Sequence, residues 1–338
     1  MDSWTDLIPI CAGILLTAAA GTRGMVAWAH RRKLLDTPNH RSSHTRPTPR
    51  GGGVALAAAF YAGLAALLAA GALEAGTLAT LLLGLPIAIV GYIDDRVSLS
   101  ARTRLAVQFA CAAALLWSLP APIPALAVLG YELPPALAYA AYLLGLLWLT
   151  NLYNFMDGID GIAAGQAIAA GLLWAAILPA ASAGPALALA AAALGFLLYN
   201  FPPARIFMGD AGSGFCGFII GALVLIQAQA SATSPLLWLL PLAPFIADAT
   251  LTLCVRVLRG QSPSQAHRSH AYQRLARRAG RHLPVSAGYF LLALLPVGGL
   301  FLWTARQAPD HAGAALIAAV AALMIAAACF GAGRDDGH

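Results

Sequence analysis

Residues 136–161 read ALAYAAYLLGLLWLTNLYNFMDGIDG, an apolar run that ends in a segment rich in carboxylates, amides and glycines. Apolar runs recur along the chain of 338 residues, of which 60% are hydrophobic and 10% charged, and the mean hydropathy is +0.75. One soluble core cannot bury that much apolar surface, whereas a helix that crosses a bilayer needs about 17 to 25 such residues. The sequence therefore predicts an all-α integral membrane protein, with residues 1–338 forming one polytopic helical bundle.

Eleven apolar stretches are candidate transmembrane helices. They cover residues 7–29, 54–73, 76–93, 104–119, 136–150, 161–180, 184–200, 213–230, 234–256, 284–305 and 311–330. Short turns at Glu74-Ala75, Ser182-Ala183 and Ser231-Ala232-Thr233 alternate with longer polar segments. We expect the catalytic loops in these polar segments, at residues 30–53, 94–103, 151–160, 201–212 and 257–283.

The basic residues indicate which side of the membrane these loops occupy. Of the 20 lysines and arginines, 18 lie in or beside the longer polar segments and the C-terminal tail. Arg306 lies in a loop on the other side, and Arg23 lies within the first span. Cytoplasmic loops carry the excess of Lys and Arg in membrane proteins. We therefore expect the polar loops and the C-terminus in the cytoplasm and the N-terminus outside.

Several classes of protein are disfavoured by the same sequence. The five cysteines stand in apolar stretches without CxxC or Cys/His spacing, which argues against a disulfide framework or a zinc site. The net charge of +6 does not indicate nucleic-acid binding, because the basic residues sit between hydrophobic segments. The start MDSWTDLIP has no basic segment before its apolar run, so we do not expect a cleaved signal peptide.

Carboxylates gather on the expected cytoplasmic side. Those in its loops or at their membrane edge are Asp36, Asp94, Asp95, Asp157, Asp160 and Asp210, while Asp248 lies inside the ninth span. A carboxylate at membrane depth is costly unless a partner, a metal or water compensates it. Separate aspartates on one face therefore predict a cation-binding cleft at the cytoplasmic interface.

Residues 91–104, GYIDDRVSLSARTR, end the third span with the adjacent carboxylates of Asp94 and Asp95. Adjacent like charges repel unless a cation or a basic group holds both ionised. With phosphate substrates that cation would be magnesium, bound through a few carboxylates and the phosphate oxygens. The alternative is a solvated acidic pair that ends the helix and is balanced by Arg96, Arg102 and Arg104.

Residues 151–161, NLYNFMDGIDG, form a second polar segment. Asn151 and Asn154 share one face if the helix continues through them, and Asp157 continues that line. In the alternative, Asp160 caps the next helix and Asp157-Gly158 forms a turn. That alternative leaves both asparagines unexplained, so we favour a ligand-binding stripe at the membrane surface.

Two further loops carry groups suited to phosphate. In residues 204–214, ARIFMGDAGSG, backbone N–H groups at a helix N-terminus can face an anion while Asp210 holds a metal. An ordinary glycine-rich turn with Asp210 as its N-cap is the alternative. In residues 36–53, Arg41, His44 and Arg50 stand in a basic loop that could grip phosphate or contact anionic lipid headgroups.

Five segments, taken in order, resemble one family. They are DTPNHRSSH and PTPRGGG within residues 36–53, DDR at 94–96, NLYNFMDGIDG at 151–161, FMGDAGS at 207–213 and HRSHAYQRL at 267–275. Together they resemble the polyprenyl-phosphate N-acetylhexosamine-1-phosphate transferases, of the glycosyltransferase family 4 type, which begin bacterial O-antigen and other carrier-lipid glycans. The resemblance covers nearly the whole chain, including the eleven spans.

The resemblance implies a bacterial inner-membrane enzyme with its active site on the cytoplasmic face. An oxygen of undecaprenyl phosphate would attack the β-phosphorus of a UDP-N-acetylhexosamine and release UMP, with Mg²⁺, or Mn²⁺ in its place, as cofactor. The product would start O-antigen, a part of lipopolysaccharide, or a related glycan. The partners implied are these two substrates and the lipid bilayer, without nucleic acid, and a homodimer is compatible with the family.

Roles for individual residues follow from the same motif positions. Asp210 would ligate magnesium, and the catalytic carboxylates would be Asp94 and Asp95, beside the acceptor phosphate, together with Asp157. Phe207 would stack on uracil. The other residues implied in substrate binding are Asn154, Asp160, Arg41, His44, Arg50, Arg268 and His270.

The last motif departs from the family at a point that bears on the donor sugar. Relatives that use N-acetylglucosamine often carry a His-x-His-His cluster where this chain has His270-Ala271-Tyr272-Gln273. The variant HRSHAYQ is similar to a branch acting on 6-deoxy sugars such as N-acetylfucosamine or N-acetylquinovosamine. We therefore expect a deoxysugar donor, with UDP-N-acetylglucosamine as the alternative. We expect residues 260–283 to form a lid over the donor that selects its sugar. From another class, a nucleotide-sugar or lipid-phosphate transporter is the alternative, although transport sites usually lie near the bilayer midplane.

Overall fold

The computed structural model describes residues 3–32, 35–36, 47–120, 123–128, 131–262 and 267–334. The long helices are α1 (Trp4–Arg32), α2 (Gly53–Ala69), α5 (Ala101–Ser118), α6 (Pro135–Phe155), α7 (Ile162–Ala175), α8 (Ala180–Asn200), α9 (Asp210–Ser231) and α15 (Ala312–Cys329). Broken helices are α3 (Ala75–Leu82) with α4 (Gly84–Val97), α10 (Pro235–Leu239) with α11 (Ala243–Leu258), and α13 (Leu283–Leu292) with α14 (Gly298–Gln307). The short helix α12 (Ala271–Ala279) joins the last two of these pairs.

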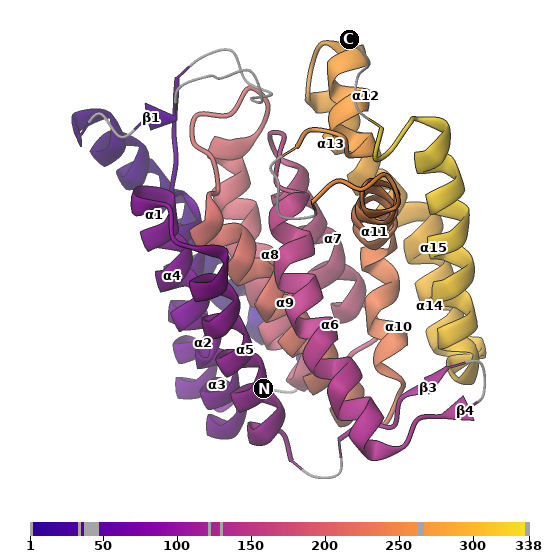
Figure 1. Ribbon diagram of the computed structural model, residues 1–338. Coiled ribbons are helices and arrows are strands. Elements are labelled where there is room, and N and C mark those ends of the chain that lie inside the picture. The colour runs from indigo at the N-terminus through magenta and orange to yellow at the C-terminus, as the bar shows by residue number, and fades with distance from the viewer. Residues whose placement is uncertain are drawn as a thin grey trace.

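Helix α9 forms the centre of the bundle. Nearly all of its apolar stretch is buried, and it packs against α4 and α6 (Figure 1). Helices α1, α2, α7 and α8 pack together beside it, and α11 packs on α15. Small residues permit the closest approaches: a Cβ on Gly91 of α4 would collide with the backbone of Asp210, and one on Gly53 of α2 would collide with Gly212. Two helices therefore rest directly on the first turn of α9.

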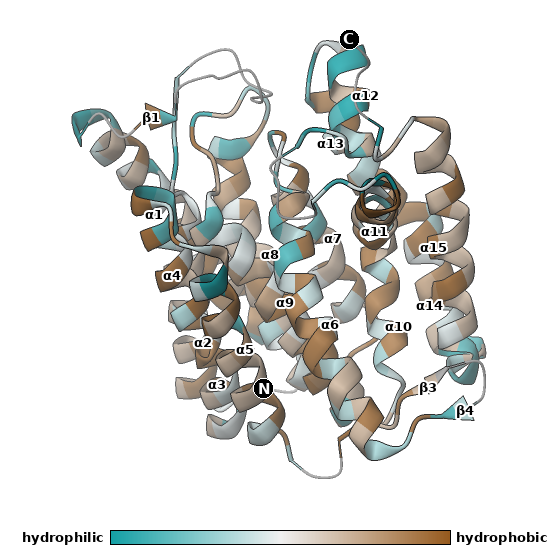
Figure 2. Ribbon diagram, viewed as in Figure 1, coloured by the Kyte–Doolittle hydropathy of each residue, from teal (hydrophilic) through white to brown (hydrophobic). Residues whose placement is uncertain are grey.

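The surface of the bundle is that of a polytopic helical membrane protein. Within the described ranges, eight helices or broken helices are long and apolar enough to cross a membrane. Helices α1 and α15 leave most of their apolar residues exposed, as lipid contact requires. Polar residues gather at the end of the bundle that carries β1, α12 and the C-terminus, while the N-terminus lies at the opposite end (Figure 2).

Helices lie in each of the eleven ranges expected to be apolar spans, but some boundaries differ. The expected turn at Ser182-Ala183 is wrong, because both residues belong to the first turn of α8 and the chain turns before Pro179. The expected loop 94–103 begins later than predicted, since Asp94 and Asp95 are still helical in α4. The ninth range is broken by a 3₁₀ turn at Leu240–Leu242, and the tenth by a π-turn at Ala293–Val297.

Two small antiparallel ladders occupy opposite ends of the bundle. Strand β1 (Leu35–Asp36) pairs with β2 (Thr48–Pro49), and β3 (Ala127–Val128) pairs with β4 (Tyr131–Glu132). Just after β2, Arg50 forms an isolated bridge with Phe207. This bridge brings the loop after α1 to the segment that precedes α9.

Candidate active site

The start of α9 is held by a carboxylate from another helix. Asp95 of α4 accepts hydrogen bonds from the backbone N–H groups of Asp210, at 3.0 Å, and Ala211, at 3.3 Å. These are among the N–H groups that a helix N-terminus leaves without a partner in the helix. Gly209 precedes them with a φ of +73°, and a Cβ there would lie 2.5 Å from a carboxylate oxygen of Asp95. Glycine therefore lets the chain pass directly beside Asp95.

Asp94 faces a different partner from its neighbour. Its carboxylate accepts a hydrogen bond of 2.6 Å from Arg104 of α5, and the same guanidinium nitrogen lies 3.4 Å from the carboxylate of Asp210. Arg104 thus joins two aspartates that are far apart in sequence. The Asp210 side chain remains 30% exposed, and that of Arg104 39% exposed, so both are open to a ligand.

Asparagines of α6 complete this side of the site. Asn154 donates to the hydroxyl of Ser213 at 2.9 Å and shares a side-chain hydrogen bond with Asp210. Asn151, one turn earlier, donates to Gln108 of α5. A cavity of about 60 Å³ lies between α4, α5, α6 and α9 and is lined by these groups. The predicted helical stripe is confirmed for the two asparagines, because α6 continues to Phe155.

Asp157 follows the end of α6 and is half-buried. Burial first, and then the charge of Asp210, raise the pKa of Asp157 well above its usual range, whereas Arg50 acts to lower it. Asp95 and Asp160 also lie near enough to raise it. Carboxylates that destabilise one another in this way are stabilised by a cation or by phosphate-bound metal.

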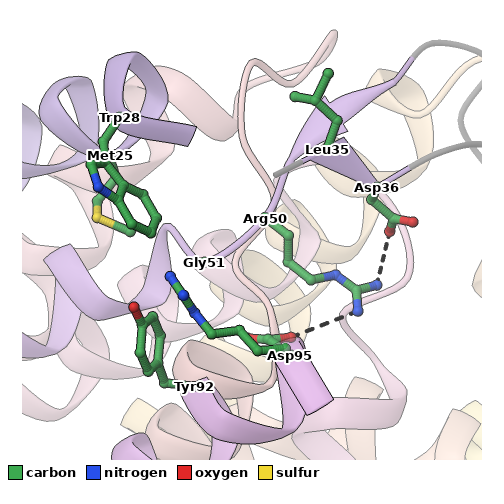
Figure 3. Close-up of a pocket in the computed structure, with 9 residues that line it drawn as sticks. Met25, Trp28, Leu35, Asp36, Arg50, Gly51, Tyr92 and Asp95 are labelled. Carbon is green, nitrogen blue, oxygen red and sulfur yellow. Dashed lines mark hydrogen bonds and ion pairs between the residues drawn. The ribbon is translucent and has the colours of Figure 1, made fainter. Parts of the chain in front are cut away.

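We call the cluster of Asp94, Asp95, Asn154 and Asp210 the carboxylate node. Arg50 reaches this node at Asp95 (Figure 3). Its guanidinium lies 2.9 Å from Asp36 and 3.6 Å from Asp95, and its side chain is 45% exposed. It lines a cavity of about 400 Å³ together with Trp28 and Tyr92, over which Arg96 stacks. Asp95 therefore borders this cavity with Arg50, whereas Asp210 borders the smaller cavity with Arg104.

Phe207 lies where the loop before α9 meets the segment after β2. Its N–H donates to Pro49 and its carbonyl accepts from Gly52, and its side chain is half-buried. This places the backbone of Phe207 beside that of Arg50. The expected contact of the Phe207 ring with uracil stays a prediction. Arg41 and His44, also expected to bind substrate, lie outside the described residues.

Other predicted site residues are not gathered at this node. Asp160 is buried, accepts from the N–H of Ala204 at 3.0 Å and lies 3.1 Å from His282. His270 is buried against Asp248, at 3.4 Å, and stacks on Phe155. Arg268 is exposed, and its carbonyl accepts from Arg277. Asp160 thus lies within the loop 156–161, His270 borders the end of α6, and Arg268 lies at the surface.

Tyr272 and Gln273, which lie in the segment expected to select the sugar, form hydrogen bonds within the protein. Tyr272 is fully buried and donates to the carbonyl of Phe155, and Gln273 accepts from the N–H of His270. Sequence reasoning also gave Arg104 only a balancing role and gave Ser213 no role of its own. No sequence signal links Arg104 to Asp210, since they lie on helices whose packing is not written in their local pattern.

Comparison with known proteins agrees with this geometry. Residues 77–228 match the family described as Glycosyl transferase family 4. The chain is 35% identical over 253 residues to the "Probable undecaprenyl-phosphate N-acetylglucosaminyl 1-phosphate transferase" of Bacillus subtilis (strain 168), covering 71% of this chain and 69% of that protein. It is 31% identical over 360 aligned positions to the "Decaprenyl-phosphate N-acetylglucosaminephosphotransferase" of Mycobacterium leprae (strain TN), covering 93% and 87%.

Another group of relatives is named for a different transferred group. The "Phospho-N-acetylmuramoyl-pentapeptide-transferase" of Moorella thermoacetica is 38% identical over 170 residues, covering 44% of this chain and 53% of that protein. All of these relatives are named as transferases, which decides against the transporter alternative. Since the relatives span most of the chain and the carboxylates converge on α9, the chain belongs to glycosyl transferase family 4 and is a polyprenyl-phosphate sugar-1-phosphate transferase.

Proposed function

We propose that this transferase moves N-acetylhexosamine-1-phosphate from a UDP-sugar to undecaprenyl phosphate and releases UMP. The observation that carries the proposal is the convergence of Asp94, Asp95, Asn154 and Asp210 on the first turn of α9, with an arginine on either side. Both substrates are polyanions, so a site that brings their phosphates together must supply positive charge and alignment. This node supplies both.

N-acetylglucosamine is the donor sugar to test first. The relatives in Bacillus subtilis and Mycobacterium leprae carry that sugar in their names. The deoxysugar expectation rested on the variant motif HRSHAYQ, and within it the side chains of Tyr272 and Gln273 form hydrogen bonds inside the protein. N-acetylfucosamine and N-acetylquinovosamine therefore become comparison donors. The glycan that the product starts, O-antigen or another, is a separate question.

The oxygen ligands around Asp210 suit magnesium. Among the described residues no group of three or more His, Cys, Asp or Glu side chains is placed to enclose a metal. Mg²⁺ usually binds through one or two carboxylates together with substrate phosphates, so a closed protein cage is not needed. Asp210, with Asn154 and Asp157 beside it, would hold the ion, which would neutralise charge on the transferred phosphate.

The protein groups then act by position and charge. Arg104 and Asp210 line one cavity and Arg50 and Asp95 the other, so each cavity offers an arginine to the phosphate groups of one substrate. The second pKa of a phosphate monoester is about 6, so the acceptor already carries a nucleophilic oxygen at neutral pH. That oxygen forms a bond to the β-phosphorus as the bond to the bridging oxygen breaks and UMP leaves. A strong general base is therefore not required.

The proposal includes an orientation in the membrane. We infer eleven spans with the node on the cytoplasmic face of a bacterial inner membrane, the N-terminus outside and the C-terminus inside. The segregation of basic residues supports it, as does the position of the two termini at opposite ends of the bundle (Figure 1).

Purified protein in detergent with undecaprenyl phosphate and magnesium tests the reaction. We expect radiolabel from UDP-N-acetylglucosamine to enter the solvent-extractable lipid with release of one UMP for each sugar transferred. UDP-N-acetylquinovosamine and UDP-N-acetylfucosamine, assayed in parallel, compare donors by kcat/KM. Labelled lipid from a deoxysugar alone would restore the first expectation, and no labelled lipid from any UDP-sugar would overturn the proposed substrates.

A further inference from the structure

Asp248 is a fully buried carboxylate that the node around Asp210 does not use. It lies on α11 and accepts from the backbone N–H groups of Ala271, at 2.9 Å, and Tyr272, at 3.0 Å. The hydroxyls of Tyr289, at 2.7 Å, and Thr252, at 3.1 Å, complete its hydrogen bonds. A buried carboxylate in an apolar helix is costly, and here four donors compensate it.

This carboxylate caps a helix to which it does not belong. The N-terminal N–H groups of α12 are normally satisfied by the side chain just before the helix. Here that residue is His270, which forms a capping box with Gln273 and whose side chain lies 3.4 Å from Asp248. The Asp248 cap is therefore added to a local one. Capping from α11 fixes the orientation of α12 relative to the bundle, which a local cap would not do.

The first turn of α12 reaches the loop that carries Asp157. The Tyr272 hydroxyl donates at 2.8 Å to the carbonyl of Phe155, the last residue of α6. Gly158 packs against the same hydroxyl so closely that a Cβ there would collide with it. Burial raises the pKa of Tyr272 well above its usual value, so the phenol stays protonated and remains a donor. Asp157 lies between these two points of contact.

We propose that Asp248 and Tyr272 are positioning residues for Asp157. Asp248 holds the start of α12, and Tyr272, held there, fixes the end of α6 and the turn after it, so that the Asp157 carboxylate faces Asp210. Neither residue touches the carboxylates of the node directly. Any effect of these two residues on donor binding rests on the proposed nucleotide-sugar donor. The contacts that connect α11 through α12 to the loop 156–161 do not depend on the identity of the donor.

Two tyrosines of this network form a matched pair for the test. Tyr272→Phe removes the hydroxyl that reaches Phe155, and Tyr289→Phe removes a hydroxyl that reaches Asp248. Each loses one hydrogen bond, so similar small losses in Tm are expected. Tyr272→Phe should raise the KM for UDP-N-acetylglucosamine about three- to tenfold, the effect of one ordinary hydrogen bond. Tyr289→Phe should leave that KM within about twofold, and neither should change the KM for undecaprenyl phosphate.

Asp248→Asn extends the test to the other end of the network. Substitutions of residues that act through one another do not have additive effects. If Asp248 acts through Tyr272, the double variant Asp248→Asn with Tyr272→Phe should have a kcat/KM for the donor no lower than that of the worse single variant. Independent additive effects would overturn this path from Asp248 to Tyr272. If Asp248→Asn does not fold, the tyrosine pair still decides.

Hydrogen exchange separates this inference from the choice of donor. Amides in residues 156–161 should exchange faster in Tyr272→Phe than in the unaltered protein, and not in Tyr289→Phe. Unchanged exchange, or the same change in both variants, would overturn the link. Failure of the unaltered protein to use UDP-N-acetylglucosamine would instead overturn the proposed donor and leave the exchange result standing.

Discussion

At the scale of single residues, Asp210 is the carboxylate best placed to meet a metal. Asp210→Asn keeps the size of the side chain and its backbone contact with Asp95, but removes the charge that magnesium prefers. We expect turnover to fall by about 100-fold at limiting magnesium, the upper range for loss of a metal-site interaction. Initial rates across a magnesium titration measure this. Glu132→Gln, the same change in an exposed residue at the far end of the bundle, should have no effect. Full activity of Asp210→Asn at limiting magnesium would show that the metal is held elsewhere.

Asp157 should lower the stability of the folded protein at the pH values at which its carboxylate is charged, which is the form that the activity needs. Its pKa is raised in the folded protein, so the folded state keeps this proton to a higher pH than the unfolded state. Its contribution to stability is therefore fully present below pH ~4 and is lost as the pH rises toward the folded pKa. Without magnesium, we expect Asp157→Asn to have a Tm a few degrees above that of the unaltered protein at neutral pH, with a smaller difference near pH 5. The variant should also be inactive. If Asp157→Asn and the unaltered protein had the same Tm at neutral pH and also near pH 5, burial and the nearby carboxylates would not raise the pKa of Asp157.

At the scale of elements, the adjacent aspartates Asp94 and Asp95 have different roles at the start of α9. Asp95 satisfies two backbone N–H groups of α9, whereas Asp94 pairs with Arg104. Asp95→Ala should therefore lower the stability by about 1 kcal/mol, the usual cost of losing a helix cap, and also lower the activity. Asp94→Ala should lower activity with a smaller loss in Tm, because its partner Arg104 is 39% exposed and can be solvated. Thermal unfolding of both variants in detergent measures the difference. Equal losses in Tm would mean that the Asp95 contacts do not cap α9.

The helices were predictable from hydropathy, but their joints and contacts were not. Ser182 seemed to mark a turn because it interrupts an apolar run, yet a serine is tolerated in the first turn of a helix, and Pro179 sets the boundary instead. The sequence predicted a cation-binding cleft from aspartates on one side of the membrane. The structure brings Asp94, Asp95 and Asp210 together at the start of α9, and cation binding there stays a prediction. The cap that Asp248 provides for α12 could not be predicted, because it depends on which helices pack together and no local spacing records that.

At the scale of the whole molecule, the bundle has one polar end and one sparsely charged end. The carboxylate node, the arginines of α12 and the C-terminal segment lie at the polar end, opposite the β3–β4 ladder (Figure 2). Phosphate chemistry at one interface suits a lipid acceptor, whose phosphate stays at the membrane surface while its chain stays in the bilayer. The two cavities are lined by Asp95 and Asp210 of the carboxylate node, so the reaction needs no passage of sugar through the bundle.

The orientation of the bundle in the membrane can be tested by labelling introduced cysteines. In a variant whose five native cysteines are replaced by serine or alanine, Glu74→Cys and Glu132→Cys should react with an impermeant maleimide added to intact cells. Both residues are exposed at the sparsely charged end, which the distribution of Lys and Arg assigns to the outside. Arg278→Cys on the exposed face of α12 should react only after the inner membrane is opened. Total labelling in detergent controls for accessibility, and retained transferase activity controls for folding. Labelling of Arg278→Cys from outside, with Glu74→Cys protected, would invert the bundle and place the carboxylate node away from a cytoplasmic supply of nucleotide sugar.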